Sequence, residues 1–292
     1  MLRSVSTKGI SAHLVRFVRR SPLHIILICI CLLWMIPTLG LLVSSLRPRP
    51  LILSTGWWTS FSTPLRFTLE NYIHVIQRAN MGRSFFNSLM ISIPATVMPI
   101  LIAAFAAYAF SWMRFPGRDT LFLMIIGLLV VPLQMTLIPI LRLFNRLQLT
   151  GNFAGVWLAH TAYGLPFAIY LLRNFIGGIP EDIFESAFLD GASHFQILYR
   201  IVLPISVPAI ASLAIFQFMW VWNDLLVALI YLGGTPEVAP MTVTISNLVN
   251  SYGGGWEFLT SAAFISMILP LVVFFSLQRY FVSGILAGSI KG

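Results

Sequence analysis

Long apolar runs alternate with short polar connections along most of this chain. The runs lie near residues 22–46, 85–111, 119–141, 152–176, 206–232 and 261–283. Each run exceeds the about 20 residues that a helix needs to cross the hydrocarbon layer of a membrane. Several runs contain proline, which transmembrane helices tolerate better than soluble helices do. We therefore predict an all-α polytopic integral membrane protein with six transmembrane helices.

The runs predict one membrane domain with a short tail. We expect residues 1–21 to be a cytoplasmic tail and residues 22–292 a single transmembrane domain. The first run is too long for the core of a signal peptide, so we expect it to remain as an anchor. Segments 47–84 and 233–258 are then external, and the connection 177–205 joins the fourth and fifth helices on the inside.

Composition and charge agree with a chain whose main partner is the lipid bilayer. Hydrophobic residues make up 58% of the 292 positions and charged residues 9%, against about 25% charged in soluble domains. The mean hydropathy is +0.89. The net charge of +9 is spread over tails and loops without a basic, aromatic-rich face, which argues against nucleic acid. With six spans, 11 of the 18 Lys and Arg residues fall inside, so both termini are expected in the cytoplasm.

The connection 177–205, here called the acidic loop, concentrates charge and turn residues. Four of the nine acidic residues of the chain lie in it, at Glu181, Asp182, Glu185 and Asp190. Pro180 and the first two acids predict the start of a short helix, since a first turn tolerates proline and favours negative charge. Gly191 can take the left-handed conformation that ends this helix, and Ser193 with Gln196 predicts a capping box for a second helix. These features are equally typical of a solvated helix–turn–helix linker.

The spacing of residues in the acidic loop resembles the signature of the membrane subunits of ABC importers. The spaced residues are Glu185-Ser186-Ala187, Gly191, Ile201 and Leu203-Pro204, and the pattern departs only at Ser186, where alanine is usual. The chain resembles carbohydrate-type ABC permeases of the MalG kind, and among them alpha-glucoside permeases most closely. The resemblance implies a coupling helix that docks into a cytoplasmic ATPase subunit. Glu185, Ser186, Ala187 and Gly191 would form the docking surface, and Ile201, Leu203 and Pro204 would anchor it to the fifth helix.

The resemblance also implies partners and a location. A second, homologous permease subunit, an ATPase dimer and an extracytoplasmic solute-binding protein would complete the importer in a bacterial cytoplasmic (inner) membrane. The only lysines are Lys8 and Lys291, and neither stands in a phosphate-binding G-x-x-x-x-G-K-[ST] frame. We therefore expect a non-catalytic subunit without a cofactor, with ATP and Mg bound by the partner ATPase. No histidine or acid shows the sequence spacing of a metal site or a catalytic site.

Polar residues inside the apolar runs are candidates for a solute path. An acid at membrane depth is costly and indicates function, while tryptophan and asparagine suit a sugar. The candidates are Gln134, Tyr163, Gln217, Trp220, Asn223 and Asp224. Each also fits a structural role, because interhelical hydrogen bonds are common between spans and tryptophans gather at the membrane interface.

The external segment 233–258 is rich in glycine and contains neither Lys nor Arg. Relatives of this type insert the equivalent loop into the sugar-binding protein, which makes 247–256 a candidate contact. The candidate residues are Asn247, Tyr252, Gly253, Gly254 and Trp256. A plain connecting loop explains the same composition.

Two classes of function remain open from the sequence. The first is the permease subunit of an ATP-driven importer that moves a sugar or glucoside by alternating access, or a compatible solute such as a glucosylglycerol. The second is an ion-coupled carrier or a polytopic membrane enzyme. The acidic loop favours the first class, and the scarcity of intramembrane acids disfavours the second. The sequence fixes neither the solute nor the subunit that holds it.

Overall fold

The computed structural model describes residues 8–61, 66–248 and 255–289, and over these ranges the chain contains helices and no strand. Four helices are long and apolar enough to cross a membrane, and the number rises to six if each of two bent helix pairs is one span. The predicted all-α membrane protein is therefore confirmed. The chain divides into two compact units, Met1–Ile73 with Trp256–Ser261 and His74–Gly255 with Ala262–Gly292.

The first unit consists of one long helix and a compact segment that follows it. Helix α1 spans Lys8–Ser45, and α2 (Arg49–Ser54) and the 3-10 helix η1 (Trp57–Phe61) come next. The buried guanidinium of Arg47 donates to the carbonyl oxygens of Thr55 (3.1 Å) and Leu51 (3.0 Å). Asn71 in turn donates to the carbonyl oxygen of Arg47 at 2.9 Å. These bonds satisfy carbonyl groups in the turn after α1 and at the end of α2, where helical partners are missing.

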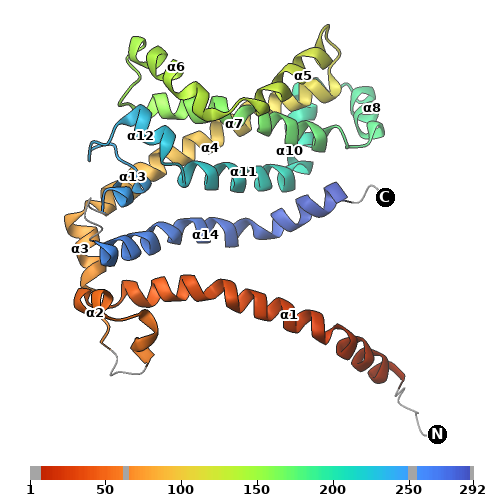
Figure 1. The fold of residues 1–292 in the computed structure, drawn as a ribbon. Helices are drawn as coiled ribbons and strands as arrows, with labels where there is room; N and C mark the ends of the chain where they lie inside the picture. The colour runs from red at the N-terminus through yellow and green to blue at the C-terminus, as the bar shows by residue number, and fades with distance from the viewer. Residues whose placement is uncertain (1–7, 62–65, 249–254, 290–292) are drawn as a thin grey trace. The chain divides into compact units, whose positions relative to one another are not determined.

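The second unit is built on three helices that pack against one another. Helix α4 (Met81–Trp112) packs against α7 (Phe153–Ile176) and α11 (Val207–Trp222), as Figure 1 shows. Small residues such as Ala95, Ala103 and Ala107 are fully buried on α4. Small side chains let helix backbones approach closely, which is how helices associate in the absence of a hydrophobic driving force.

The third apolar run is bent sharply instead of forming one continuous helix. Helix α5 (Arg118–Gly127) and the 3-10 helix η2 (Leu128–Val130) end before Pro132, and α6 (Leu133–Arg146) leaves at an angle of 101°. Val131 is extended, with φ −73° and ψ 116°. Proline lacks an N–H and pushes the preceding residue out of the helical region, which explains the break.

The fifth run is bent at its start and interrupted within it. A bend of 73° separates His194–Ile205 from α11, and α11 ends at Trp222 before the short helix α12 (Leu226–Leu232). Helices α13 (Met241–Ser246) and α14 (Trp256–Ser289) follow. The short helix α3 (Glu70–Arg78) leads from the first unit into the second. Within the second unit, the acidic loop and the α12–α13 pair lie at opposite ends of α4 and α7 (Figure 1).

Candidate functional site

The acidic loop folds locally as its sequence predicts. Helix α8 (Glu181–Leu189) starts directly after Pro180, with two acids in its first turn. Gly191 has φ +79°, the predicted left-handed conformation. The capping box of α9 (His194–Ile197) is present: Ser193 Oγ accepts from the Gln196 N–H (3.3 Å), and Gln196 Oε1 accepts from the Ser193 N–H (2.8 Å). The chain continues through a π-helical turn η3 (Leu198–Val202) and α10 (Leu203–Ile205).

One face of α8 is fixed to the ends of two long helices. Phe184 is buried and stacks on Trp112 of α4, with ring centroids 3.7 Å apart and an interplanar angle of 21°. Trp112 Nε1 donates to the carbonyl oxygen of Ile176, the last residue of α7, at 3.1 Å. The Tyr108 hydroxyl of α4 lies 2.9 Å from His194 Nδ1 at the start of α9. Helix α8 is therefore in direct contact with α4, and Trp112 of α4 is in turn hydrogen-bonded to the end of α7.

The opposite face of the loop is open. Glu185, Ser186 and Gly191 are exposed, whereas Ala187 is buried at 8% exposure and packs in the apolar cluster beneath α8. The structure thus places Ala187 on the anchoring face rather than on the docking surface that the resemblance implies. Ile201 and Leu203 are half-buried and pack against the same cluster, while Pro204 is exposed.

Exposed aromatic and aliphatic side chains on the loop were not among the sequence candidates. Leu189 is 87% exposed, Phe195 64% and Tyr199 67%. The rings of Phe195 and Tyr199 are parallel to within 7°, with centroids 6.4 Å apart. Their spacing of four residues within a charged loop is the signal that could have identified them, because such residues share one helix face. The loop therefore exposes apolar side chains as well as acids.

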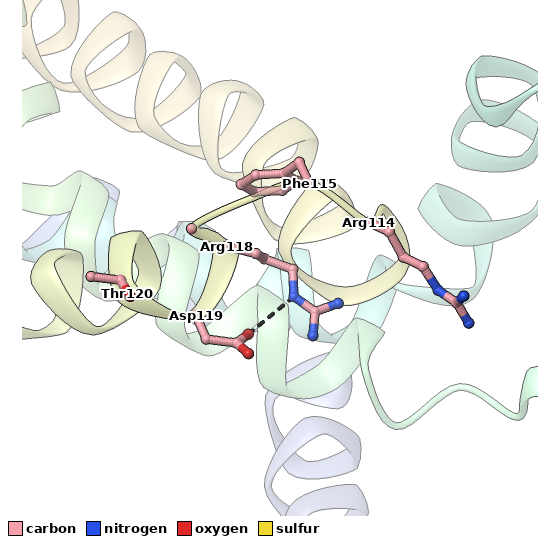
Figure 2. Close-up of a pocket in the computed structure, with 6 residues that line it drawn as sticks. Arg114, Phe115, Arg118, Asp119 and Thr120 are labelled. Atoms are coloured by element: carbon pink, nitrogen blue, oxygen red, sulfur yellow. Dashed lines mark hydrogen bonds and ion pairs between the residues drawn. The ribbon is translucent and has the colours of Figure 1, made fainter.

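A basic hollow of about 460 Å³ lies at the same end of the second unit, at the turn from α4 to α5. Figure 2 shows Arg118 directed toward Asp119, with its Nε 3.0 Å from the carboxylate, while Arg114 extends away from that pair. This turn follows Trp112, the residue that contacts α8. Positive and negative side chains therefore flank the anchored end of α4.

A second hollow, of about 260 Å³, lies between α7 and α11. It contains three of the six sequence candidates for a solute path, Tyr163, Gln217 and Trp220. Its other lining residues are Gly164, Phe167 and Phe216. Aromatic walls with a few polar groups are typical of small-molecule sites.

Two of these candidates also hold helices together. Gln217 is buried and its Nε2 donates to the carbonyl oxygen of Ala95 on α4 at 3.1 Å. The Tyr163 hydroxyl lies 2.9 Å from Thr136 Oγ1 on α6 and 3.0 Å from the Tyr231 hydroxyl on α12. The interhelical hydrogen bonds that the sequence allowed are therefore present at both side chains, which also line the hollow. Their part in a solute path stays a prediction.

The other three candidates lie outside this hollow. Gln134 is exposed in the first turn of α6, and exposed Asn223 donates to the carbonyl oxygen of Met219 in its own helix at 2.7 Å. Asp224 joins α11 to α12: its carboxylate accepts from the N–H groups of Val227 (3.3 Å) and Ala228 (3.0 Å). The break in the fifth run is thus held by a side-chain cap.

The sequence did not reveal which residue lies beside Asp224. His160 of α7 is fully buried, and its Nε2 lies 3.6 Å from Asp224 Oδ2. The two residues are far apart in the chain, so no sequence spacing reveals the pair. Within the described residues no group of three or more His, Cys, Asp or Glu side chains could hold a metal ion.

The candidate contact residues of the external segment are only partly described. Asn247 follows α13 and is exposed, and Trp256, the first residue of α14, is 51% exposed. Tyr252, Gly253 and Gly254 lie outside the described residues.

Comparison with known proteins finds a matching family and similar permeases. Residues 8–286 match the family described as "Binding-protein-dependent transport system inner membrane component". The chain is 61% identical to the osmoprotective compounds uptake permease protein GgtD of Synechocystis sp., over 94% of this chain and 93% of that protein. It is 42% identical to the alpha-glucoside transport system permease protein AglG of Rhizobium meliloti, over 94% of this chain and 99% of that protein.

A solved structure shares the fold. A chain from a bacterial ABC transporter involved in the import of the acidic polysaccharide alginate gives a TM-score of 0.64 at 18% identity, over 96% of this chain and 100% of that chain. A second structure of the alginate transporter, in complex with its alginate pentasaccharide-bound periplasmic protein, also gives 0.64, at 17% identity over 90% and 95% of the chains.

Proposed function

The chain belongs to the family of binding-protein-dependent transport system inner membrane components, and on this premise we propose that it is the permease subunit of an ATP-driven importer for a sugar or glucoside. The similarity to the alpha-glucoside permease supports the solute class. The greater identity to the osmoprotective compounds permease supports a second candidate, a compatible solute of the glucosylglycerol type. Both candidates are small and rich in hydroxyl groups, which suits the aromatic and amide lining of the hollow between α7 and α11.

The observation that carries the proposal is the two-faced acidic loop. Its buried side ties α8 to α4 and α7 through Phe184 and Trp112, and its exposed side chains include Glu185, Leu189 and the Phe195–Tyr199 pair. An anchored helix with an open apolar and charged face is suited to a soluble partner. We assign that partner as the ATPase dimer, which binds ATP and Mg and hydrolyses ATP in its own subunits.

Coupling then follows from the contacts. Closure of the ATPase dimer displaces α8, the Phe184–Trp112 stack transfers the displacement to α4, and the Trp112–Ile176 hydrogen bond transfers it to α7. Since α7 and α11 wall the hollow, the same displacement alters access to it. A homologous second permease and an extracytoplasmic solute-binding protein complete the importer, in a bacterial cytoplasmic membrane with both termini inside.

Reconstitution tests this assignment of roles. The purified chain alone should hydrolyse no ATP, and it should co-purify with an ATPase dimer through residues 181–204. Glu185→Lys reverses an exposed charge on the loop and should abolish co-purification, because repulsion replaces attraction at the interface. Glu237→Lys changes another exposed acid, between α12 and α13, and should leave co-purification intact.

Two outcomes would overturn the proposal. Robust ATP hydrolysis by the isolated chain would remove the need for a partner ATPase. Solute accumulation by the chain alone, driven by an ion gradient, would show an ion-coupled carrier. Uptake of radiolabelled α-glucosides and glucosylglycerol by the complete complex decides between the two solute candidates.

A further inference from the structure

His160 is an unusual residue for the interior of a helix bundle. Its side chain is fully buried in α7, and neither ring nitrogen has a hydrogen-bond partner within the described chain. Buried polar atoms are nearly always paired, so an unpaired one needs a reason beyond packing. An apolar side chain of similar size would fill the same space without the desolvation of two ring nitrogens.

His160 lies between the side chains of Asp224 and Trp220. On one side, Nε2 lies 3.6 Å from Asp224 Oδ2. On the other, the imidazole meets the indole of Trp220 at 90°, with ring centroids 5.2 Å apart. An edge-to-face arrangement brings the positive ring edge to the negative ring face and holds the two planes in one orientation.

The two neighbours of His160, Asp224 and Trp220, each have a defined position. Asp224 is fixed, because the first turn of α12 donates two N–H groups to its carboxylate and Thr242 Oγ1 of α13 donates to its carbonyl oxygen at 2.6 Å. Trp220 is 38% exposed and lines the hollow between α7 and α11. Of these three side chains, only the His160 imidazole neither hydrogen-bonds to the described backbone nor lines the hollow.

From this geometry we propose that His160 is a positioning residue, which sets the indole plane of Trp220 as a stacking platform for one pyranose ring of the solute. The inference rests on the proposed import of a glucoside and assigns the site to this subunit. The C–H groups on one face of a pyranose ring carry partial positive charge, and they suit the negative face of an indole. The Gln217 amide on the same wall supplies polar contact.

The size of the hollow limits what it takes. Its volume of about 260 Å³ lies below the about 300–1,000 Å³ typical of sites for drug-sized ligands. It suits a single sugar ring, so the rest of a larger glucoside must lie outside this hollow. A one-ring probe, methyl α-glucopyranoside, is therefore sufficient for the test.

The test uses the complete importer complex in nanodiscs, labelled with 5-fluorotryptophan and observed by ¹⁹F NMR. The Trp220 resonance is assigned with Trp220→Phe. His160→Leu removes both the aromatic ring beside Trp220 and the nitrogen beside Asp224, whereas His160→Phe keeps an aromatic ring alone. Thr161→Val is the matched control, because Thr161 is a buried neighbour on α7 whose hydroxyl has no hydrogen-bond partner in the described structure.

The variants are expected to differ in the size of their effect on Trp220 and on probe affinity. In the wild type, methyl α-glucopyranoside shifts the Trp220 resonance. His160→Leu should move that resonance in the free complex and weaken the apparent affinity for the probe at least tenfold, with His160→Phe intermediate and Thr161→Val unchanged. Basal ATPase activity should stay within twofold of wild type in all three variants, which separates positioning from a general structural defect.

The contrary results are distinct. If His160→Leu leaves the Trp220 resonance and the probe affinity at wild-type values, even with a reduced yield of complex, His160 only fills space. If the wild-type complex transports glucosides but methyl α-glucopyranoside does not shift the Trp220 resonance, Trp220 is not a stacking platform. The proposed function then stands. If the complex transports no glucoside, the proposed solute class is wrong, and the inference that rests on it is wrong as well.

Discussion

Gly191 is the residue of the acidic loop at which a single change should weaken the coupling between the ATPase subunits and the transmembrane helices. It has φ +79°, between the end of α8 and the capping box of α9. A Cβ atom built on it would meet nothing within 4 Å. The cost of a side chain here therefore comes from the backbone conformation and not from a clash within the chain.

The magnitude follows from that conformation. A left-handed backbone costs a non-glycine residue roughly 1–2 kcal/mol, and a β-branched residue is a clear outlier there. A cost of one to two kcal/mol lowers the equilibrium ratio of the observed turn to its alternatives by a factor of about 5–30. Gly191→Val should therefore reduce solute-stimulated ATPase activity and uptake by up to that factor, and the yield of membrane-inserted protein should be unchanged because the long helices are untouched.

The assay is uptake and stimulated ATPase activity in proteoliposomes that contain the complete complex. Gly191→Asn is the matched control, because asparagine enters the left-handed region far more readily than valine does. It should retain most of the coupling. Wild-type coupling in the valine variant would refute the reasoning, since the turn would then not be needed. Equal loss in both variants would show that the side chain obstructs the docked partner and that backbone strain is irrelevant.

The features that sequence predicted correctly are those set by neighbouring residues. Pro180, Gly191 and the Ser193–Gln196 capping box depend on contacts within a few residues, and the structure confirms all three. The spaced loop pattern likewise identified the family, which the match over residues 8–286 confirms. Hydrophobic run lengths identified the membrane-spanning class because helix length and bilayer thickness are directly related.

The breaks in the helices were not predictable in the same way. Pro94 and Pro99 lie inside α4 without interrupting it, whereas Pro132 ends one helix and begins another. A proline in a transmembrane helix is accommodated when neighbouring groups satisfy the freed backbone, and this depends on tertiary packing. Composition alone therefore gives no means of distinguishing Pro132 from Pro99.

The candidate solute site shows the same limit. Tyr163, Gln217 and Trp220 were identified one by one as polar or aromatic residues at depth, but only the packing of α7 on α11 brings them to one hollow. His160 and Asp224 meet only because α11 stops at Trp222 and the chain turns toward α12. A single continuous helix over 206–232, as the hydrophobicity predicts, gives no reason for that pairing.

Two further predictions address the anchoring of the loop and the solute path. Phe184→Ala removes a buried ring from the Trp112 stack and should destabilise the loop by about 3–5 kcal/mol, lowering both the thermal stability of the complex and its coupling, while Phe184→Leu should be milder. Equal melting temperatures for these two variants would contradict this role. Asn223→Ala should raise the KM for uptake or change selectivity among glucosides without reducing the yield of complex. The amide of Asn223 is exposed and its bond to the Met219 carbonyl stays within one helix, so its loss costs little packing. A site that hydrogen-bonds sugar hydroxyls loses discrimination when one partner is removed. Uptake kinetics and complex yield measured on the same preparations separate the outcomes, and an unchanged KM with a reduced yield would exclude Asn223 from the path.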